Sequence, residues 1–196
     1  MDMIKLNNLK RAFTLAEIII TLTIIGIVVV IMMQVLQPNV DAIRYKAQLN
    51  AAHALISRAI IQYQAENMCS GNLSICDEFV YENTDIEQIY HEMFDDKFKL
   101  EQRCGILVGQ GCFTKGNYKY KNGDIFANPD DDANYYKIRL QNSISIAFSA
   151  PLPRCQDNVC MRIIVDTNGP QGPNIVNRDV YEGIVTTTQV KFNMEE

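Results

Sequence analysis

The strongest pattern in the chain is a long apolar run close to its N-terminus. Eighteen of the 24 residues from Phe13 to Leu36 are apolar. As a helix this run would rise about 36 Å, at about 1.5 Å per residue, which is enough to cross a hydrocarbon core of about 30 Å with some tilt. The pattern therefore predicts one membrane-spanning helix.

The charges before the run indicate how this helix is oriented. Residues 1–12 carry three basic side chains and one acidic side chain. Basic residues mark the cytoplasmic flank of a membrane span, so the N-terminus is expected in the cytoplasm and the C-terminal part outside it. A cleaved secretory signal is the alternative, but its apolar core is shorter and ends at small residues, which residues 32–36 do not supply.

A second helical pattern follows the apolar run, between residues 40 and 61. Apolar residues recur there at helical spacing along two adjacent lines, so the apolar stripe is wide. The first line is Ile43, Ala47, Ala51, Ala54 and Leu55, and the second is Leu49, Ile56 and Ile60, which continues to Tyr63 just beyond this segment. This width suits a helix that packs on its own domain and on neighbouring helices, although a well-buried helix has the same pattern. One helix is predicted from about Thr14 to Glu66, with Gly26 and Pro38 as points of bending or local melting.

The periodicity changes after Met68, and strands are expected from Cys104 onward. A short helix is predicted from Asp85 to Phe94, with Thr84 or Asp85 as its cap. The clearest strand is Tyr136 to Ser149, where apolar residues share one face and polar residues share the other. The apolar face is Ile138, Leu140, Ile144, Ile146 and Phe148, and the polar face is Lys137, Arg139, Gln141, Ser143 and Ser145. Further candidate strands are Gly105–Val108, Tyr118–Lys121, Met161–Val165 and Val180–Phe192. A long helix beside a small antiparallel sheet predicts an α+β fold.

Composition removes several classes of protein. The chain is 47% hydrophobic, with 10 Gly and 6 Pro, which does not suit a disordered or collagen-like protein. A single long apolar run also excludes a multi-pass transporter. The net charge is -5, and acidic residues outnumber basic ones by 21 to 15 after residue 38, which argues against a broad nucleic-acid-binding face.

All six cysteines follow the apolar run, on the side expected to lie outside the cytoplasm, so disulfides are predicted. The candidates are Cys69, Cys76, Cys104, Cys112, Cys155 and Cys160. Six cysteines allow 15 connectivities, and sequence order alone does not choose among them. Local pairs, Cys69 with Cys76, Cys104 with Cys112 and Cys155 with Cys160, are favoured because each closes a small loop. A zinc site is the rival interpretation, but the chain has no C-x-x-C, and its two histidines, His53 and His91, lie far from the cysteines in sequence.

One loop contains candidate ligands for calcium. Its oxygen-bearing side chains, which are of the kind that calcium prefers, are Asp166, Asn168, Asn174 and Asp179. The loop lacks the third ligand and the terminal glutamate of an EF-hand, so tight turns are the preferred explanation and calcium is the lesser candidate. A second loop that could bind a cation is the acidic run at residues 128–132, with Asp130, Asp131 and Asp132. It is expected to be a solvated loop. No cofactor is otherwise predicted.

The sequence offers no support for catalysis. It contains no Gly-rich phosphate loop, no G-x-S-x-G and no H-E-x-x-H, and two histidines are few for a His-based triad. The chain is therefore expected not to be an enzyme.

Glu17 is the exception within the apolar run. A carboxylate at mid-membrane depth costs about 2.5–3.5 kcal/mol on insertion scales, and less near the interface. Either the side chain extends to the lipid headgroups, or it meets a specific positive partner in an assembled state.

The residues around Glu17 favour the second explanation. The sequence from Lys10 to Glu17, KRAFTLAE, followed at once by an apolar helix, resembles the prepilin N-terminus of type IV pilins and type II secretion pseudopilins. The resemblance implies cleavage between Ala12 and Phe13 by a prepilin peptidase and N-methylation of Phe13. It also implies that Glu17 neutralises the new amine of a neighbouring subunit. The sequence departs from the family pattern at Ala12, where Gly is usual, and at Ala16, where a larger aliphatic residue is more common.

The resemblance implies four segments and a structural role. Residues 1–12 would be a removed cytoplasmic leader, 13–37 the transmembrane and assembly half of the helix, 38–66 its amphipathic half, and 67–196 an exported head. The expected fold is the pilin-like α+β arrangement. The expected partners are other pilin or pseudopilin subunits, in a homo- or hetero-polymer, the prepilin peptidase and methylase, an inner-membrane assembly platform and membrane lipid. Nucleic acid is disfavoured. The expected location is the bacterial inner membrane, and then a pilus or pseudopilus.

Two rival functions remain open at this point. A membrane-anchored domain that binds a ligand and never polymerises would share the span and the exported head. An anchored exported enzyme would require an activity in the isolated head.

Overall fold

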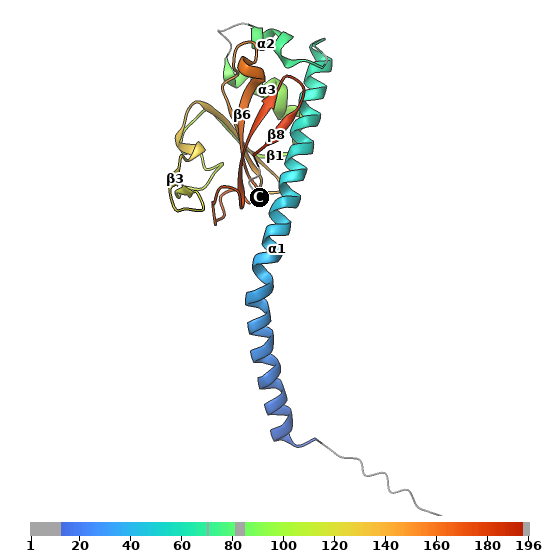
Figure 1. Ribbon diagram of the computed structural model, residues 1–196, viewed down its shortest axis with the longest axis vertical. Coiled ribbons are helices and arrows are strands. Elements are labelled where there is room, and N and C mark those ends of the chain that lie inside the picture. Colours follow the sequence, from blue (N-terminus) through green and yellow to red (C-terminus); the bar gives the residue numbers. More distant parts are fainter. Residues whose placement is uncertain (1–12, 70, 81–84, 194–196) are drawn as a thin grey trace, which may run out of the picture. The chain divides into compact units, whose positions relative to one another are not determined.

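The computed structural model describes residues 13–69, 71–80 and 85–193. The chain divides into two compact units, one ending at Asp41 and the other beginning at Ala42. One long helix, α1 (Leu15–Glu66), supplies all the helical structure among the described residues of the first unit and continues into the second (Figure 1). The residues after Glu66 are called the head below.

Helix α1 is continuous through Gly26 and Pro38, so the local melting expected at these residues does not occur. From Ala42 onward, one face of the helix lies in the hydrophobic core of the second unit. The buried hydrophobic residues are Tyr45, Leu49, Ala52, Ile56, Ala59, Ile60 and Tyr63. The wide stripe of the sequence is thus divided, because the line containing Ile56 is buried and the line containing Ile43 is exposed.

Short helices connect α1 to the sheet and join some of the strands. They are η1 (Leu73–Ile75), α2 (Asp77–Val80), α3 (Ile86–Phe94), η2 (Asp95–Lys97), η3 (Pro129–Asp131) and η4 (Gln156–Asn158). Asp85 caps α3 by accepting a hydrogen bond from the Glu87 amide, as predicted. The alternative cap, Thr84, lies outside the described residues.

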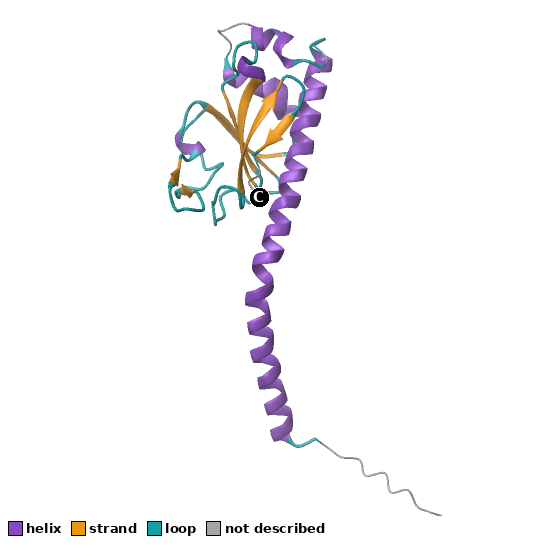
Figure 2. Ribbon diagram, in the orientation of Figure 1, coloured by secondary structure: helices purple, strands orange, loops and turns teal. Residues whose placement is uncertain are grey.

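Six antiparallel strands form the main sheet of the head, in the order β1-β4-β5-β6-β7-β8 (Figure 2). Their bounds are β1 (Leu100–Gly105), β4 (Tyr135–Leu140), β5 (Ser145–Ser149), β6 (Val159–Asp166), β7 (Val180–Thr186) and β8 (Val190–Phe192). A separate two-stranded sheet pairs β2 (Tyr118–Lys119) with β3 (Ile125–Phe126). The predicted α+β fold, a long helix with a small antiparallel sheet, is confirmed, and its architecture is pilin-like.

The stretch expected to be one strand from Tyr136 to Ser149 is a hairpin of β4 and β5. The Leu140 amide donates to the Ile144 carbonyl at 2.8 Å, and Ser143 adopts a φ of 65° in the turn. Leu140 and Ile144 remain in the same core cluster, so the alternation continues through the turn and periodicity alone could not reveal it. The candidate strand 180–192 is likewise divided, into β7 and β8, and the candidate strand 105–108 is wrong because β1 ends at Gly105.

Both faces of the sheet are covered, which the alternation did not predict. In β5, Ile146 and Phe148 join the cluster that contains the buried face of α1, whereas Ala147 joins a second cluster with residues of β2 and β3. Lys137, expected on a solvent-facing side, is 0% exposed, and its Nζ donates to the Asp132 carbonyl at 2.8 Å. Burial lowers the pKa of the Lys137 ammonium group.

The acidic loop at residues 130–132 is not the fully solvated loop that was expected. Asp130 is buried, and its carboxylate accepts a hydrogen bond from the Gly111 amide at 2.9 Å. Only Asp131 is exposed in this run, and Asp132 is partly buried. The loop belongs to the second layer that covers the sheet, and this packing was not visible in the local charge pattern.

Candidate processing and assembly site

The first turn of α1 closes on itself through Thr14 and Glu17. The Thr14 amide and the Thr14 hydroxyl both donate to Oε2 of Glu17 at 2.9 Å. In return, the Glu17 amide donates to Oγ1 of Thr14 at 3.3 Å. This reciprocal pattern is a capping box, in which a Thr and a Glu three residues later satisfy amide groups that have no partner within the helix.

The capping box gives the Glu17 carboxylate a partner within its own chain. From the sequence, either exposure at the lipid surface or a partner in another subunit was expected for Glu17, and the role of Thr14 was missed. The signal was present, because Thr14 and Glu17 have the S/T-x-x-E spacing in front of an apolar run.

The box also fixes where the helix begins relative to the expected cleavage point. Helix α1 starts at Leu15, and Phe13 precedes it as non-helical, 81% exposed chain. Ala12 and the rest of the leader, residues 1–12, lie outside the described residues. Phe13, the one residue of the expected junction that the structure describes, is therefore exposed chain outside the helix.

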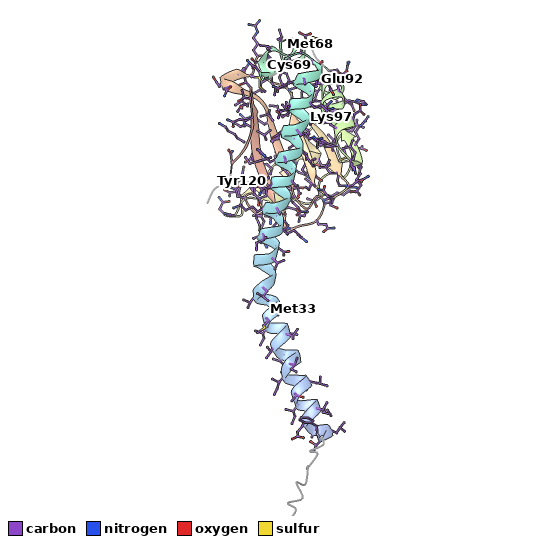
Figure 3. The ribbon with its side chains drawn as sticks, turned by 90° about the vertical axis from the view of Figure 1, so that its right-hand side faces the viewer. Met33, Met68, Cys69, Glu92, Lys97 and Tyr120 are labelled. Atoms are coloured by element: carbon purple, nitrogen blue, oxygen red, sulfur yellow. A yellow bond between two sulfur atoms is a disulfide. The ribbon has the colours of Figure 1, made fainter. Side chains whose placement is uncertain are left out.

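The apolar run is exposed around the whole circumference of the helix. Every large apolar side chain from Phe13 to Leu36 is between 43% and 81% exposed. Among the described residues, α1 is the one helix long and apolar enough to cross a membrane. Met33, labelled in Figure 3, is one such side chain and is 65% exposed.

Three disulfides staple the head. Their Cα atoms are 5.2 Å apart in Cys69–Cys76, 6.2 Å in Cys104–Cys112 and 3.9 Å in Cys155–Cys160. These are the three local pairs that the sequence favoured. The first lies immediately after α1, where Cys69 and Met68 are seen at the end of the helix (Figure 3).

The loop with candidate calcium ligands is organised around two buried carboxylates. Asp166 is 0% exposed; its Oδ2 accepts a 2.7 Å hydrogen bond from the Tyr118 hydroxyl, and its Oδ1 accepts one from the Asn168 amide at 3.2 Å. Burial, reinforced by repulsion from Asp179, raises the pKa of Asp166 to about 8.

Asp179 is held in the same manner. Its two oxygens accept hydrogen bonds from the amides of Asn174 and Ile175, at 2.7 and 2.8 Å, and burial raises its pKa. Both carboxylates are thus bound by donors of the protein itself. In the part of the chain that the structure describes, no group of three or more His, Cys, Asp or Glu side chains is placed to hold a metal ion. The loop geometry favours tight turns, and calcium binding stays a prediction.

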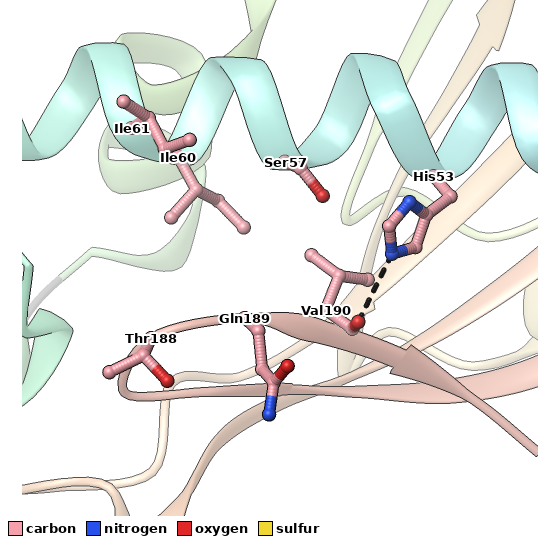
Figure 4. Close-up of a pocket in the computed structure, with 7 residues that line it drawn as sticks. All are labelled: His53, Ser57, Ile60, Ile61, Thr188, Gln189 and Val190. Atoms are coloured by element: carbon pink, nitrogen blue, oxygen red, sulfur yellow. Dashed lines mark hydrogen bonds between the residues drawn. The ribbon is translucent and has the colours of Figure 1, made fainter.

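Two surface cavities lie between α1 and the head. The first, of about 190 Å³, separates α1 from the β7–β8 turn and is lined by His53, Ser57, Ile60, Ile61, Thr188, Gln189 and Val190 (Figure 4). His53 Nε2 lies 3.1 Å from the Val190 carbonyl oxygen, so this histidine joins the helix to the edge strand. The second, of about 340 Å³, lies between Leu55, residues 97–99 and the β4–β5 turn.

Together, the apolar helix, its capped start and the disulfide-stapled head define a membrane-anchored α+β protein of pilin-like architecture. Comparison with known families gives the finer assignment. Residues 7–33 match the family model of the prokaryotic N-terminal methylation motif. The chain therefore carries the prepilin-type signal of type IV pilins and pseudopilins, and the matched range includes the Ala12–Phe13 junction, Thr14 and Glu17. No curated protein and no solved structure matches the chain.

Proposed function

We propose that this chain is a structural subunit of a type IV pilus or of a type II secretion-like filament. It would be cleaved between Ala12 and Phe13, N-methylated on Phe13 and polymerised through α1. The observation that carries the proposal is the methylation motif at residues 7–33, because the matched range includes the capped beginning of a helix whose large apolar side chains are exposed on every side.

The four predicted segments acquire separate duties in this proposal. Residues 1–12 are the leader that is removed, and residues 13–37 anchor the subunit in the inner membrane and later pack in the filament core. Residues 38–66 join that core to the head, and residues 67–196 decorate the outside. The head would face away from the cytoplasm, a compartment in which its three disulfides can form.

Cleavage would occur in chain that the fold leaves outside the helix. Proteases bind substrates most readily in extended conformation, and Phe13 lies two residues before the start of α1. The capping box keeps the helix from extending into the junction. The prepilin peptidase and methylase are therefore the first partners, acting before the assembly platform.

Glu17 would act in assembly by exchanging or sharing its partner. In the free subunit, its Oε2 accepts two hydrogen bonds from Thr14, while Oε1 takes part in none of the bonds of the box. After cleavage, the amine of a neighbouring Phe13 would supply the opposite charge. A charge pair within a low-dielectric bundle is stable only when both partners are present, so the pair would fix the axial register of subunits.

N-terminal processing is the direct test. The full chain is expressed with an active prepilin peptidase, isolated from membranes and analysed by mass spectrometry. We expect loss of residues 1–12 and a gain of about 14 Da from one methyl group. The variant Ala12→Gly should be processed like the wild type and Ala12→Leu should not, because the residue before the cut is expected to be small. Mature protein that retains residues 1–12 while the peptidase cleaves a control prepilin would overturn the proposal and favour a simple anchored domain.

A further inference from the structure

The solvent-facing side of α1 between Ala42 and Ala65 carries basic residues and no acidic residue. Helical spacing places an apolar line at its centre and basic side chains on both flanks. The central line includes Ile43 and Ile61, which are 71% and 64% exposed, and the small residues Ala47 and Ala54; the flanks carry Arg44 and Arg58 on one side and Lys46 on the other. These seven residues are called the basic ridge.

The acidic residues of the head are concentrated next to the C-terminal end of α1. The segment from Asp77 to Glu101 contains nine acidic and two basic residues. Among the described residues, its exposed acidic side chains are Asp77, Asp85, Glu87, Glu92, Asp96 and Glu101. Because Glu101 lies on β1 and pairs with Arg139, only the first five are called the acidic end. Lys97 fixes its place, because Nζ lies 2.9 Å from Glu66 Oε2 and donates to the Glu92 carbonyl at 2.9 Å (Figure 3).

The two surfaces are offset along the helix axis. Arg58 and Arg44 precede Glu66 by 8 and 22 residues, a rise of about 12 to 33 Å at about 1.5 Å per residue. A second copy shifted by a distance in this range would bring its acidic end beside the basic ridge of the first. Such a contact joins two different surfaces, so it repeats without closing and produces an open assembly.

We propose that the basic ridge binds the acidic end of a second copy of this chain. This inference rests on the proposed function and names the contact that would orient neighbouring heads. The apolar line supplies area to be buried, and the charges supply selectivity and orientation, since exposed ion pairs contribute only about 0.2–1 kcal/mol each.

The charge distribution favours a second copy over a lipid surface as the partner. Anionic headgroups would attract the basic ridge but repel the acidic end. Binding to lipid would also not explain why the two surfaces are offset along the helix axis. A second copy uses both surfaces at once. The experiment therefore changes each surface separately and then both together.

The test compares charge-reversed forms of the full chain. The ridge variant is Lys46→Glu with Arg58→Glu, the end variant is Glu92→Lys with Asp96→Lys, and a third form combines all four changes. The matched control is Arg162→Glu with Lys191→Glu, which alters two exposed basic residues of the sheet, outside both surfaces. Filament yield in cells and self-association of the full chain in detergent are measured, with near-UV circular dichroism to verify the fold.

We expect the ridge variant and the end variant each to lower self-association about tenfold, as loss of about 1.4 kcal/mol would. The combined form should recover to within about threefold of the wild type, because opposite charges face each other again, and the control should be unchanged. Salt at about 1 M should reduce the differences, since it screens exposed charges.

Three results would overturn the contact. The first is wild-type association in all forms, and the second is a combined form no better than the single-surface variants. The third is a ridge variant that loses only its binding to anionic vesicles while the end variant behaves as wild type, which would assign the ridge to lipid. If the wild-type chain is processed but forms no filament, the proposed function fails, and association in detergent still decides whether this contact exists.

Discussion

The two parts of α1 lie on one continuous helix but differ in what they bury. Up to Leu36, the large apolar side chains of the helix are 43–77% exposed on all sides. After Ala42, the same helix buries a single face, on which Ile56 and Tyr63 are 0% and 1% exposed. The first part has a surface suited to lipid and to other helices, and the second has one suited to its own sheet. Apolar residues in these two parts should therefore respond to different experiments.

The largest effect is expected at Glu17, the one charge in the first part. Replacing it with Ala should reduce incorporation into filaments by at least about a hundredfold, because the neighbouring amine would be left unpaired in the bundle. Membrane insertion should not weaken, since a costly carboxylate is removed. Incorporation is measured as the ratio of sheared filament to membrane-bound subunit, with Glu17→Asp as a partial form. Normal incorporation of Glu17→Ala would show that the charge has no role in assembly.

A core substitution in the second part should destabilise the head and not the anchor. Ile56→Ala removes a 0% exposed side chain, and such a deletion costs about 2–5 kcal/mol. Ile61→Ala, five residues later and 64% exposed, is the matched control and should change unfolding by less than about 0.5 kcal/mol. Denaturant unfolding of the full chain in detergent measures both. Equal effects of the two substitutions would contradict the assignment of Ile56 to the buried face of the helix and of Ile61 to its exposed face.

Periodicity predicted both parts of α1 but not which apolar line would be buried. The lines containing Ile56 and Ile43 look alike in sequence, and only the position of the sheet distinguishes them. In the head, the alternation of apolar and polar residues predicted the apolar face of β4 and β5. It missed the turn at Ser143, because even-numbered residues face the core on both sides of the turn. It placed Lys137 toward solvent because nothing local shows that a second layer of loops covers that face.

The candidate functional residues divide in the same way. Glu17 stands out in sequence because a charge within an apolar run is costly, and the family motif overlaps it. Thr14 was missed although its spacing to Glu17 is that of a capping box. For Asp166 and Asp179, the sequence suggested oxygen ligands. The bond of Asp166 to the Tyr118 hydroxyl depends on segments brought together only by the fold, whereas Asp179 accepts from the nearby amides of Asn174 and Ile175 in a local turn.

Reduction of the disulfides should destabilise the head without affecting the membrane anchor. The Cys69–Cys76 pair closes a loop with a sequence separation of 7, for which the chain-entropy model gives about 2.4 kcal/mol. Replacing both cysteines with Ala should lower the stability of the head by about that amount. Dithiothreitol should lower the stability of the wild-type head further, because it reduces all three pairs. Membrane retention should not change, because the first part of α1 has no cysteine. Loss of anchoring on reduction would contradict this independence.

The head should also lose stability as the pH rises. The first part of α1 should not show this dependence, because its contacts are apolar. Burial raises the folded-state pKa of Asp166 to about 8, above its ordinary value of 3.8. The folded state therefore binds the proton more tightly, so the stabilisation is complete below the unfolded pKa and is lost as pH increases from about 4 through about 8. Asp166→Asn should flatten part of this dependence, and raised pKa values at Asp179 and Asp95 would account for the remainder. Unfolding of the head followed from pH 4 to 9 measures the slope, and a slope of opposite sign would refute the assignment.

The smallest effect is expected at Thr14, where the first part of α1 begins. Thr14→Val keeps the shape of the side chain but removes the hydroxyl that donates to Glu17 and accepts from its amide. This loss should lower the stability of the first helical turn by about 0.5–2 kcal/mol. Thr14→Ser keeps both bonds and is the control. Hydrogen exchange of the amides from Leu15 to Ile18, in the full chain in detergent, should accelerate in the Val variant only, while unfolding of the head is the same in both. If the Val variant exchanges as slowly as the Ser variant, the first turn is held by its apolar surroundings, and the capping box contributes nothing to where the helix begins.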